Sequence, residues 1–511
     1  MGNFSEIGAT VRHDVTFVVA PHWGDHHFQG RAVLPAVEAM QLLAHCCGRA
    51  LPGTPVRHIA QAAFEKFLEL PPAGHSVAAF CDLTALPDGG VQAVLLTRTQ
   101  TGATGIRRTK THARVVFKPG PLSEPAIALD LAAALAGPVF RVVPERVYDE
   151  LVPFGPAFHT ITQPVQLSRD GALAALKAAD RPDVLTGMPL GSPLVLDGAM
   201  HAACVWAQRF ANVVAFPLGI DERLILRPTC AGETYWARIF SVKTDGAGLV
   251  FDIWIIDALG RLREWLKGVR MRDMSGGRLH PPEWIGCGRD ADGLDALRPH
   301  CAALTLIDRD GLLPFSDGCL SADERQRVMK MGPRRRQGFM AVRLACKRLA
   351  RDLSGDRTMP AGDLSTVRTQ DGRPACPLPE GAPSYTCAAA HDRRFALAAA
   401  DQQPVGVDVE TVAARLLASL HLFANACEQA RVNASPLGAS QAATRVWSIK
   451  EAVAKALRIT LADAWQRTEV SALGKTQSQL RIDAGHVVEA FHQTLGEHLV
   501  TLVVLRKDGA L

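Results

Sequence analysis

The stretch DHHFQGRAVLPAVEAMQLLAHCC, residues 25–47, decides how the first part of the chain folds. Pro35 suits the first turn of a helix, where a missing N–H leaves no hydrogen bond unmade. From Pro35 to Cys47 the residues are apolar around most of a helical circumference, which predicts a helix enclosed by other structure. Gly30 permits a tight bend upstream, so we expect His26 to lie on a strand or turn near the mouth of this helix.

A second stretch has the same character. DGAMHAACVWAQRFANVV, which starts at Asp197, is also apolar around most of its circumference. Segments rich in β-branched and aromatic residues accompany the two helices: GVQAVLLTRT, HARVVF, ETYWARIFSVKT and GLVFDIWII. We therefore predict an α+β fold in which one unit, a helix wrapped in a curled antiparallel sheet, occurs twice.

The composition excludes several classes of protein. The net charge of +5, from 56 basic and 51 acidic residues, is interspersed and too mild to indicate a nucleic-acid partner. The twelve cysteines form no Cys-x-x-Cys pair, which fits a reduced compartment. No apolar run reaches membrane-spanning length and the N-terminus lacks a signal pattern, so we expect a cytoplasmic protein with no membrane partner.

A boundary lies in DMSGGRLHPPEWIGCGRDADGLDALRPH, residues 273–300, which is rich in Gly, Pro and charge and has no hydrophobic periodicity. We place a linker at residues 276–300 within it. The linker predicts that the parts on either side fold separately.

Three motifs in the first part resemble those of polyketide synthase dehydratases. They are His-x-x-x-Gly-x-x-x-x-Pro from His26 to Pro35, PFGPAFH at residues 153–159 and LDGAMH at residues 196–201. The resemblance implies a double hot-dog fold, with the first hot-dog at residues 1–125 and the second at residues 126–275.

The same resemblance assigns roles in dehydrating a 3-hydroxyacyl thioester. His26 would be the base that takes the α-proton, and Asp197 the acid that protonates the departing hydroxyl. His201, one helical turn after Asp197, would hold that carboxyl in place. His27 would be a neighbour that points the other way. Phe154 stands where the family usually has tyrosine, which puts the rate or the substrate range in doubt.

Two alternatives remain for the first part. A product-template-like cyclase shares the fold and the His/Asp pair but directs aldol closure. A non-catalytic module would dock a carrier protein for modification by the second part. Dehydration of a short 3-hydroxyacyl-pantetheine substrate distinguishes the three possibilities.

The second part contains a pattern of charged residues suited to a divalent cation. PVGVDVE, residues 404–410, predicts a strand on which Asp408 and Glu410 share one face while the valines enter the core. VWSIKEAVAKAL predicts a helix with Glu451 and Lys455 one turn apart. Three carboxylates and a lysine suit Mg²⁺ bound to a pyrophosphate, because hard oxygen ligands hold the ion and the ammonium offsets remaining negative charge.

This part, residues 301–511, resembles the phosphopantetheinyl transferases of the surfactin-synthetase-activating type, which have a pseudo-two-fold α+β fold. The resemblance rests on motifs that follow in family order: PRRRQGFMAVRLACKRL, DGRP, AHDRRFALAAA, VGVDVE and WSIKEAVAK.

The resemblance implies that Asp408, Glu410 and Glu451 bind Mg²⁺ and that Lys455 binds the pyrophosphate of coenzyme A. It also implies that Arg343, Arg373 and His391 bind coenzyme A, and that Glu428 lies near the metal or acts as a base. Two departures weaken single contacts, because Ala390 replaces a serine before His391 and the glycine that commonly follows the lysine motif is absent.

Together these patterns predict a bifunctional enzyme of polyketide or fatty acid biosynthesis that pairs a 3-hydroxyacyl dehydratase with a 4'-phosphopantetheinyl transferase. The chain contains no Asp-Ser-Leu carrier motif, so we expect an acyl carrier protein to act in trans or to belong to a separate component of the synthase. A homodimer through the hot-dog part is a further expectation.

Overall fold

The computed structural model of the chain describes residues 7–101, 106–177, 188–245, 248–289, 293–366, 374, 383–483 and 485–506. The chain divides into two compact units, Met1–Pro125 with Phe140–Arg289 and Ala126–Val139 with Asp290–Leu511. The segment Ala126–Val139, predicted above as the start of the second hot-dog, therefore belongs to the second unit.

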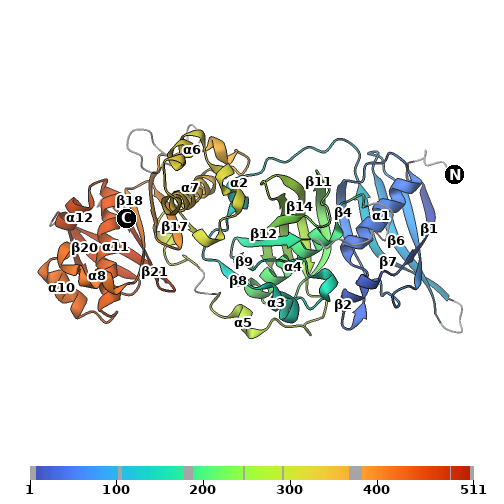
Figure 1. Cartoon of the computed structure of the whole chain (residues 1–511), viewed down its shortest axis with the longest axis horizontal. Helices are drawn as coiled ribbons and strands as arrows, with labels where there is room; N and C mark the ends of the chain where they lie inside the picture. The colour runs from blue at the N-terminus through green and yellow to red at the C-terminus, as the bar shows by residue number, and fades with distance from the viewer. Residues whose placement is uncertain are drawn as a thin grey trace. The chain divides into compact units, whose positions relative to one another are not determined.

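The first unit is built on two enclosed helices, α1 (Ala36–Ala50) and α4 (Pro193–Phe210). Within the described residues β2 (His27–Phe28) pairs separately with β3 (Arg31–Ala32). The other twelve strands form one antiparallel sheet that wraps around both helices (Figure 1). In the order of the sheet they are β1 (Thr10–Val18), β5 (Ser76–Ala85), β6 (Val91–Thr101), β7 (Ile106–Phe117), β4 (His58–Phe64), β11 (Phe216–Ile225), β14 (Leu262–Arg272), β13 (Gly248–Asp257), β12 (Thr234–Asp245), β10 (Gly171–Lys177), β9 (Val165–Ser168) and β8 (Phe140–Val142).

The strand order contains the predicted repeat. Outward from the centre it runs β4, β7, β6, β5, β1 on one side and β11, β14, β13, β12, β10 on the other. In chain order each helix is followed by its own four strands, and the first of each four, β4 and β11, pair with one another. The structure confirms the α+β class and the doubled helix-in-sheet unit.

The residue pattern of the two helices explains their position. Met40, Leu43 and Ala44 of α1 have no exposed surface, and all positions of α4 from Leu194 to Arg209 are buried. The second helix begins at Pro193, one turn before the predicted start at Asp197, because a proline fits the first helical turn as Pro35 does beside α1. Asp197 therefore lies inside the helix.

The second unit has two similar halves. Its first half contains the sheet β15–β17–β16 and its second half the sheet β18–β22–β21–β20–β19. The strands are β15 (Ala303–Asp308), β16 (Thr386–His391), β17 (Phe395–Asp401), β18 (Val405–Thr411), β19 (Thr468–Ala472), β20 (Gln477–Ile482), β21 (His486–Leu495) and β22 (His498–Val504). The helices are α2 (Leu129–Ala133), α6 (Ala322–Met329), α7 (Pro333–Ser354), α8 (Ala414–Ala418), α9 (Leu420–Phe423), α10 (Ala426–Asn433), α11 (Ala439–Leu457) and α12 (Leu461–Arg467).

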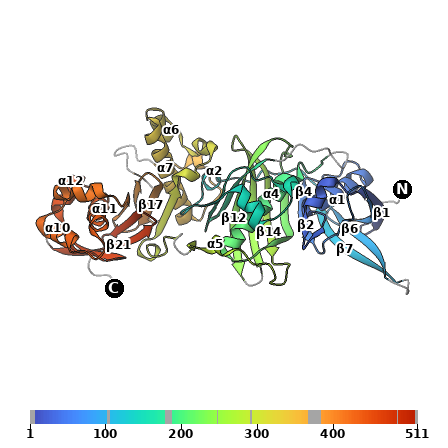
Figure 2. The same cartoon turned by 60° about the horizontal axis from the view of Figure 1, so that its bottom comes forward.

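Long helices cover the two sheets in the same way. The first half places α7 on β15 and β17, and the second half places α11 on β18 and β22. Figure 2 shows α10, α11 and α12 beside the strands of the second half. A shorter helix, α6 or α10, precedes each long one, and both begin with a capping box, in which the first-turn glutamate and the N-cap side chain satisfy each other's backbone N–H groups.

Each half also contains one buried Glu–Lys ion pair. Glu324 lies 2.9 Å from Lys347 in the first half, and Glu428 lies 2.8 Å from Lys450 in the second. All four side chains are essentially unexposed. Because buried charges need partners, these pairs tie each short helix to its long helix. None of the helices within the described ranges has the combination of length and apolar character that crossing a bilayer requires.

Candidate active sites

The predicted catalytic histidine of the first unit, His26, follows a short 3-10 helix, Pro21–Asp25. Gly30, with a φ of +77°, turns the chain back so that His26 Nδ1 lies 3.0 Å from the carbonyl oxygen of Val33. Because a carbonyl oxygen only accepts, Nδ1 carries the proton and Nε2 keeps its lone pair. Burial lowers the pKa of His26, although the charge of Asp197 opposes the shift. A neutral imidazole is the form that a general base needs.

A loop from the second half of the unit packs on this histidine. The ring of Phe154 stacks on His26 with 4.4 Å between centroids. Asp25 holds the loop, since its Oδ2 accepts the N–H of Ala157 at 2.8 Å and its carbonyl oxygen accepts the N–H of Gly155 at 2.8 Å. A side chain at position 155 would collide with Asp25, which explains the glycine.

Asp197 and His201 face each other on α4. Asp197 Oδ2 and His201 Nε2 are 3.0 Å apart, and both side chains are buried. The spacing of one helical turn brings them together, as predicted. Tyr148 packs edge-on against His201 with 5.9 Å between ring centroids. Because Asp197 lies within the helix, the end of the helix dipole favours its ionised form less than a position at the N-terminus would.

His26, Asp197 and His201 line one cavity that encloses about 1000 Å³, its open mouth included. Much of the remaining lining is apolar: Val33, Leu34, Phe64, Phe67, Leu95, Phe154, Met200, Phe216 and Met271. His27 also lines the cavity, with its ring edge-on to Phe154 at 6.2 Å. The prediction that His27 points away is therefore wrong, since the adjacent side chains diverge around Phe154 without leaving the cavity.

The second unit brings strand β18 and helix α11 into close contact. A Cβ atom at Gly406 would collide with the carbonyl of Ala452, so the glycine allows α11 to lie directly on β18. Val405, Val407 and Val409 enter the core, as the alternating pattern predicts.

The predicted charged residues meet at this contact. Lys455 Nζ lies 3.0 Å from Asp408 Oδ1 and 3.2 Å from Glu451 Oε2, and it donates to the carbonyl of Val407 at 2.9 Å. Asp408 is only 3% exposed, and its Oδ2 has no hydrogen-bond partner among the described residues.

Like charges crowd this cluster. Burial, with the charges of Asp408 and Glu451 adding to it, raises the pKa of Glu410 to about 7, while Arg415 opposes the shift. Burial and Asp408 also raise the pKa of Glu451. Burial disfavours the charged form of Lys455, but Asp408 and Glu451 outweigh it and raise the pKa of the ammonium.

The cluster has the donor chemistry for a hard cation. The free, buried Asp408 oxygen and the raised carboxyl pKa values are what an added positive charge would relieve. Within the described ranges, however, no group of three or more His, Cys, Asp or Glu side chains is arranged as a formed metal site. The Lys455 ammonium lies within 3.2 Å of both Asp408 and Glu451.

A second cavity, of about 850 Å³ with its open side, adjoins this cluster. Its lining comes from Pro374, from β16, from the end of α11 and from the residues that follow this helix: Pro374, Cys387, Ala388, Ala389, Glu451, Ala454, Lys455, Arg458, Ile459 and Leu461. Two cations, Lys455 and Arg458, therefore border a space large enough for part of a nucleotide cofactor.

The residues predicted to bind coenzyme A differ in their placement. His391 ends β16 beside Gly338, and burial followed by the charges of Arg309 and Lys455 lowers its pKa, so it lies within the field of the cluster. Arg343 is buried and donates to the carbonyl oxygen of Thr366 at 2.9 Å, so a phosphate would have to compete with this contact. Arg373 lies outside the described residues, whereas its neighbour Pro374 lines the cavity.

The structure gives Glu428, predicted to lie near the metal or to act as a base, a set of structural contacts. Its carboxylate is fully buried and accepts hydrogen bonds from Asn425 N, Val470 N and Lys450 Nζ at 2.8–2.9 Å. The counterpart Glu324 has equivalent contacts in the other half, so this glutamate belongs to the frame of the unit.

Sequence reasoning missed Asp25, which adjoins His26 and holds the loop of Phe154. Nothing in the local pattern indicates a partner in Ala157, 132 positions away. The only available signal is the presence of an aspartate beside the histidine of the motif.

Two known protein families match parts of the chain. Residues 128–281 match the model described as the polyketide synthase dehydratase N-terminal domain, and residues 404–503 match that of the 4'-phosphopantetheinyl transferase superfamily. The first match includes Asp197 and His201, and the second includes Asp408, Glu410, Glu451 and Lys455 among the residues of the cluster. The chain thus combines a dehydratase-type region and a phosphopantetheinyl-transferase-type region, both of enzyme families.

Individual relatives are distant. The chain is 27% identical over 241 residues to one subunit of the polyunsaturated fatty acid synthase of Thraustochytrium sp., a match that covers 43% of this chain and 8% of that protein. Among solved structures, it is similar to the dehydratase domain of a mycocerosic acid synthase-like polyketide synthase, with 18% identity and a TM-score of 0.41, covering 54% of this chain and 98% of the other. A trans-AT polyketide synthase dehydratase domain from Brevibacillus brevis gives 16% identity and a TM-score of 0.43, covering 53% and 98%.

Proposed function

We propose that the second unit transfers 4'-phosphopantetheine from coenzyme A to a serine of an acyl carrier protein supplied in trans. The observation that carries this proposal is the buried, unpartnered oxygen of Asp408 beside Glu451 and Lys455, next to a cavity lined by two cations.

In the proposed transfer the serine oxygen attacks the β-phosphorus of the pyrophosphate, the bond to the bridging oxygen breaks, and adenosine 3',5'-bisphosphate leaves. Glu451, whose pKa is raised by burial and by Asp408, accepts the serine proton. Lys455 binds the pyrophosphate as a point charge. Mg²⁺, held by Asp408, Glu410 and Glu451, would supply further charge neutralisation on the phosphates.

Incubating the purified chain with an apo-carrier protein, coenzyme A and Mg²⁺ tests this function. The expected result is a mass gain of the carrier equal to one phosphopantetheine, lost when EDTA replaces Mg²⁺. No mass gain on any carrier tried from polyketide and fatty acid synthases would contradict the proposal.

We also propose that the first unit dehydrates 3-hydroxyacyl thioesters. His26 Nε2 takes the α-proton, Asp197 protonates the β-hydroxyl, the carbon–oxygen bond breaks and water leaves with formation of the enoyl thioester. The supporting observation is that His26 and the Asp197–His201 pair, from opposite halves of the unit, line the same largely apolar cavity. An apolar lining suits the acyl chain of such a substrate.

A pair of adjacent substitutions tests the dehydratase. We expect His26→Ala to lower conversion of a 3-hydroxyacyl-pantetheine to the enoyl form by about 10²-fold or more, the usual cost of a lost general base. His27→Ala is the matched control and should keep most of the activity, with phosphopantetheine transfer unchanged in both variants. Mass spectrometry measures both reactions, and an inactive His27→Ala beside an active His26→Ala would overturn the assignment.

A further inference from the structure

Residues 126–139 form a strap that crosses the second unit, far in sequence from the rest of that unit. The strap contains helix α2, and Ala128, Ala132, Ala133 and Ala134 have no exposed surface. Helix α2 packs against α7 and against the turn at Pro314–Cys319. The strap is therefore part of the hydrophobic core of the unit, and it is not a surface loop.

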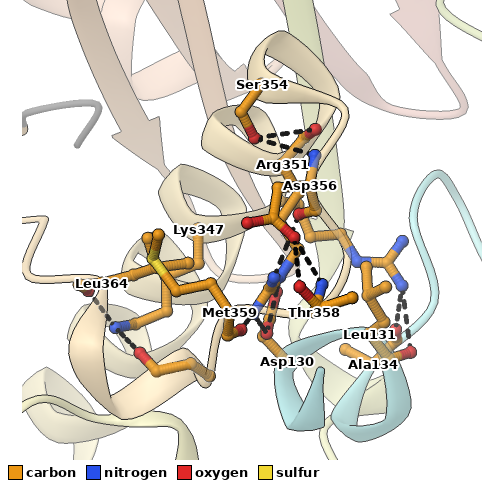
Figure 3. Close-up of polar contacts among 12 residues, drawn as sticks. Asp130, Leu131, Ala134, Lys347, Arg351, Ser354, Asp356, Thr358, Met359 and Leu364 are labelled. Carbon is orange, nitrogen blue, oxygen red and sulfur yellow. Dashed lines mark hydrogen bonds and ion pairs between the residues drawn. The ribbon is translucent and has the colours of Figure 1, made fainter. Parts of the chain in front are cut away.

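One ion pair fixes the strap to α7. The guanidinium of Arg351 donates to both carboxylate oxygens of Asp130, at 2.8–3.0 Å, and the two side chains are almost completely buried (Figure 3). Figure 3 also shows Arg351 reaching the carbonyl oxygen of Met359, so the same side chain joins the strap to the turn after α7.

Backbone groups of the strap are satisfied by the same unit. Arg348, also on α7, donates to the carbonyl oxygens of Leu131 and Ala134 at 3.1 and 2.9 Å. Gly137 N–H donates to the carbonyl of Leu306 at 2.7 Å, next to β15 residue Ile307, which forms an isolated bridge with the strap. Leu313 N–H donates in turn to Ala133.

Removing the strap would leave the second unit with charges that have lost their partners. Arg351 would lose the carboxylate to which it donates, and Arg348 would lose two acceptors, in positions that are 3–4% exposed. An unpaired buried charge is far more costly than a lost surface contact. Apolar surface on α7 and beside β15 would also be opened to water.

We propose that residues 126–139 are an obligatory component of the second unit, whose helix α7 and strand β15 form the surface that binds this strap. Phosphopantetheine transfer requires the strap to be bound there. The part of the proposal that concerns transfer rests on the proposed function. This surface on α7 and β15 binds a short, alanine- and leucine-rich helix with one acidic residue in its first turn. The linker at residues 276–300 is then not a sufficient place to cut the chain, contrary to the sequence-based expectation.

The first test changes the ion pair in the full chain. Asp130→Ala should lower the melting temperature of the second unit by about 5–10 °C, because a broken buried pair is expensive, and leave the transition of the first unit in place. Asp323→Ala, an exposed aspartate in the same unit, is the matched control and should shift melting by about 1 °C or less. The double variant Asp130→Leu with Arg351→Met should recover most of the loss, since no charge is then left unpaired.

The second test replaces residues 128–137 of the full chain by a Gly/Ser sequence of equal length. We expect the thermal unfolding transition of the second unit and phosphopantetheine transfer to be lost together. The unfolding transition of the first unit, and any 3-hydroxyacyl dehydration by it, should persist. A synthetic peptide of residues 126–139, added in excess, should restore both; a peptide with Asp130 changed to Lys should not. A replaced chain that melts and transfers like the wild type would overturn the proposal, as would loss of the first unit's transition alone. If the unmodified chain melts normally but shows no phosphopantetheine transfer, and no variant shows transfer either, the result would instead count against the proposed function.

Discussion

The two halves of the second unit share a frame and differ in chemistry. Both contain a short capped helix whose buried glutamate pairs with a lysine of the long helix, Glu324 with Lys347 and Glu428 with Lys450. Both long helices also end in the left-handed conformation. These repeated features stabilise the fold, since they occur whether or not a half carries a reactive cluster.

The difference lies at positions counted from the buried lysine. One residue later the first half has Arg348 and the second has Glu451; five residues later they have Asp352 and Lys455. On the strand that faces the long helix, Thr305 of the first half donates to Asp352 at 3.3 Å. At the corresponding place in the second half, Asp408 lies 3.0 Å from Lys455. The first half uses Arg348 to hold the strap, and the second half uses the same place to build a cluster of carboxylates. Positions that differ between the two halves therefore indicate function better than positions that the two halves share.

The largest effect should come from the facing strand positions. Under the proposed function, Asp408→Ala should reduce phosphopantetheine transfer by about 10³-fold or more, because the loss of a proposed Mg²⁺ ligand would remove several kcal/mol of transition-state stabilisation. Thr305→Ala, at the counterpart position, should leave the rate within about threefold. Mass analysis of a carrier under initial-rate conditions measures both, and equal losses would mean that the halves are not functionally distinct.

The shared glutamates should behave alike. Glu428→Gln and Glu324→Gln should each destabilise the second unit by about 3 kcal/mol or more, which lowers its melting temperature by roughly 6–12 °C, since each leaves a buried lysine without its charge partner. At a temperature where both variants are folded, their transfer rates should be close to that of the wild type. A folded Glu428→Gln with no activity, beside an active Glu324→Gln, would restore a catalytic role to Glu428.

The carboxylate cluster should make the stability of the second half depend on pH. The pKa of Glu410 is about 7 in the folded chain against an ordinary 4.5, so between these values the folded state binds more protons than the unfolded state. Stability without Mg²⁺ should therefore fall as the pH rises from about 4.5 to about 7, and Glu410→Gln should flatten this dependence. Denaturant titrations across that range measure it; a slope unchanged by the substitution would exclude Glu410 as its source. Mg²⁺ should bind more tightly toward pH 8, with release of a proton.

The smallest effect concerns the ends of the long helices. Gly355 ends α7 with a φ of +68°, which glycine adopts freely, whereas Arg458 ends α11 with a φ of +58°. Arg458→Gly should stabilise the unit by about 1 kcal/mol and raise the KM for coenzyme A roughly fivefold, because the side chain lines the cavity beside Lys455. Calorimetry measures the change in stability, and enzyme kinetics measures the change in KM independently of it. A gain in stability with an unchanged KM would show that Arg458 does not contact the substrate.

Periodicity is enough to predict the enclosed helices of the first unit and single elements of the second. The apolar stretches at Pro35 and Asp197 indicate enclosed helices, and the Val-Asp-Val-Glu alternation places the carboxylates of β18 on one side. Periodicity says nothing about contacts between distant segments, so sequence order alone assigns the strap to the hot-dog that follows it in the chain. Its decisive contact, Asp130 with Arg351, joins residues 221 positions apart.

The parts of the candidate sites that can be predicted from sequence are those whose residues lie close together in the chain. Asp197 and His201, or Glu451 and Lys455, are one turn apart on a helix, and the structure brings each pair together. The role of Glu428 is harder to predict, because a capping glutamate and a catalytic glutamate look alike in sequence. The three buried donors that contact its carboxylate favour the capping role.

The strap has a consequence for synthesis of the chain. Asp130 leaves the ribosome 221 residues before Arg351, which at about 5–20 residues per second is a delay of about 10–45 s. During that time the alanines and leucines of the strap have no native surface to cover them, while the sequence around them already folds. Nascent chains stalled with the strap outside the ribosome and α7 still inside it should therefore bind, at the strap, a chaperone that recognises apolar segments, and chains released beyond α7 should not.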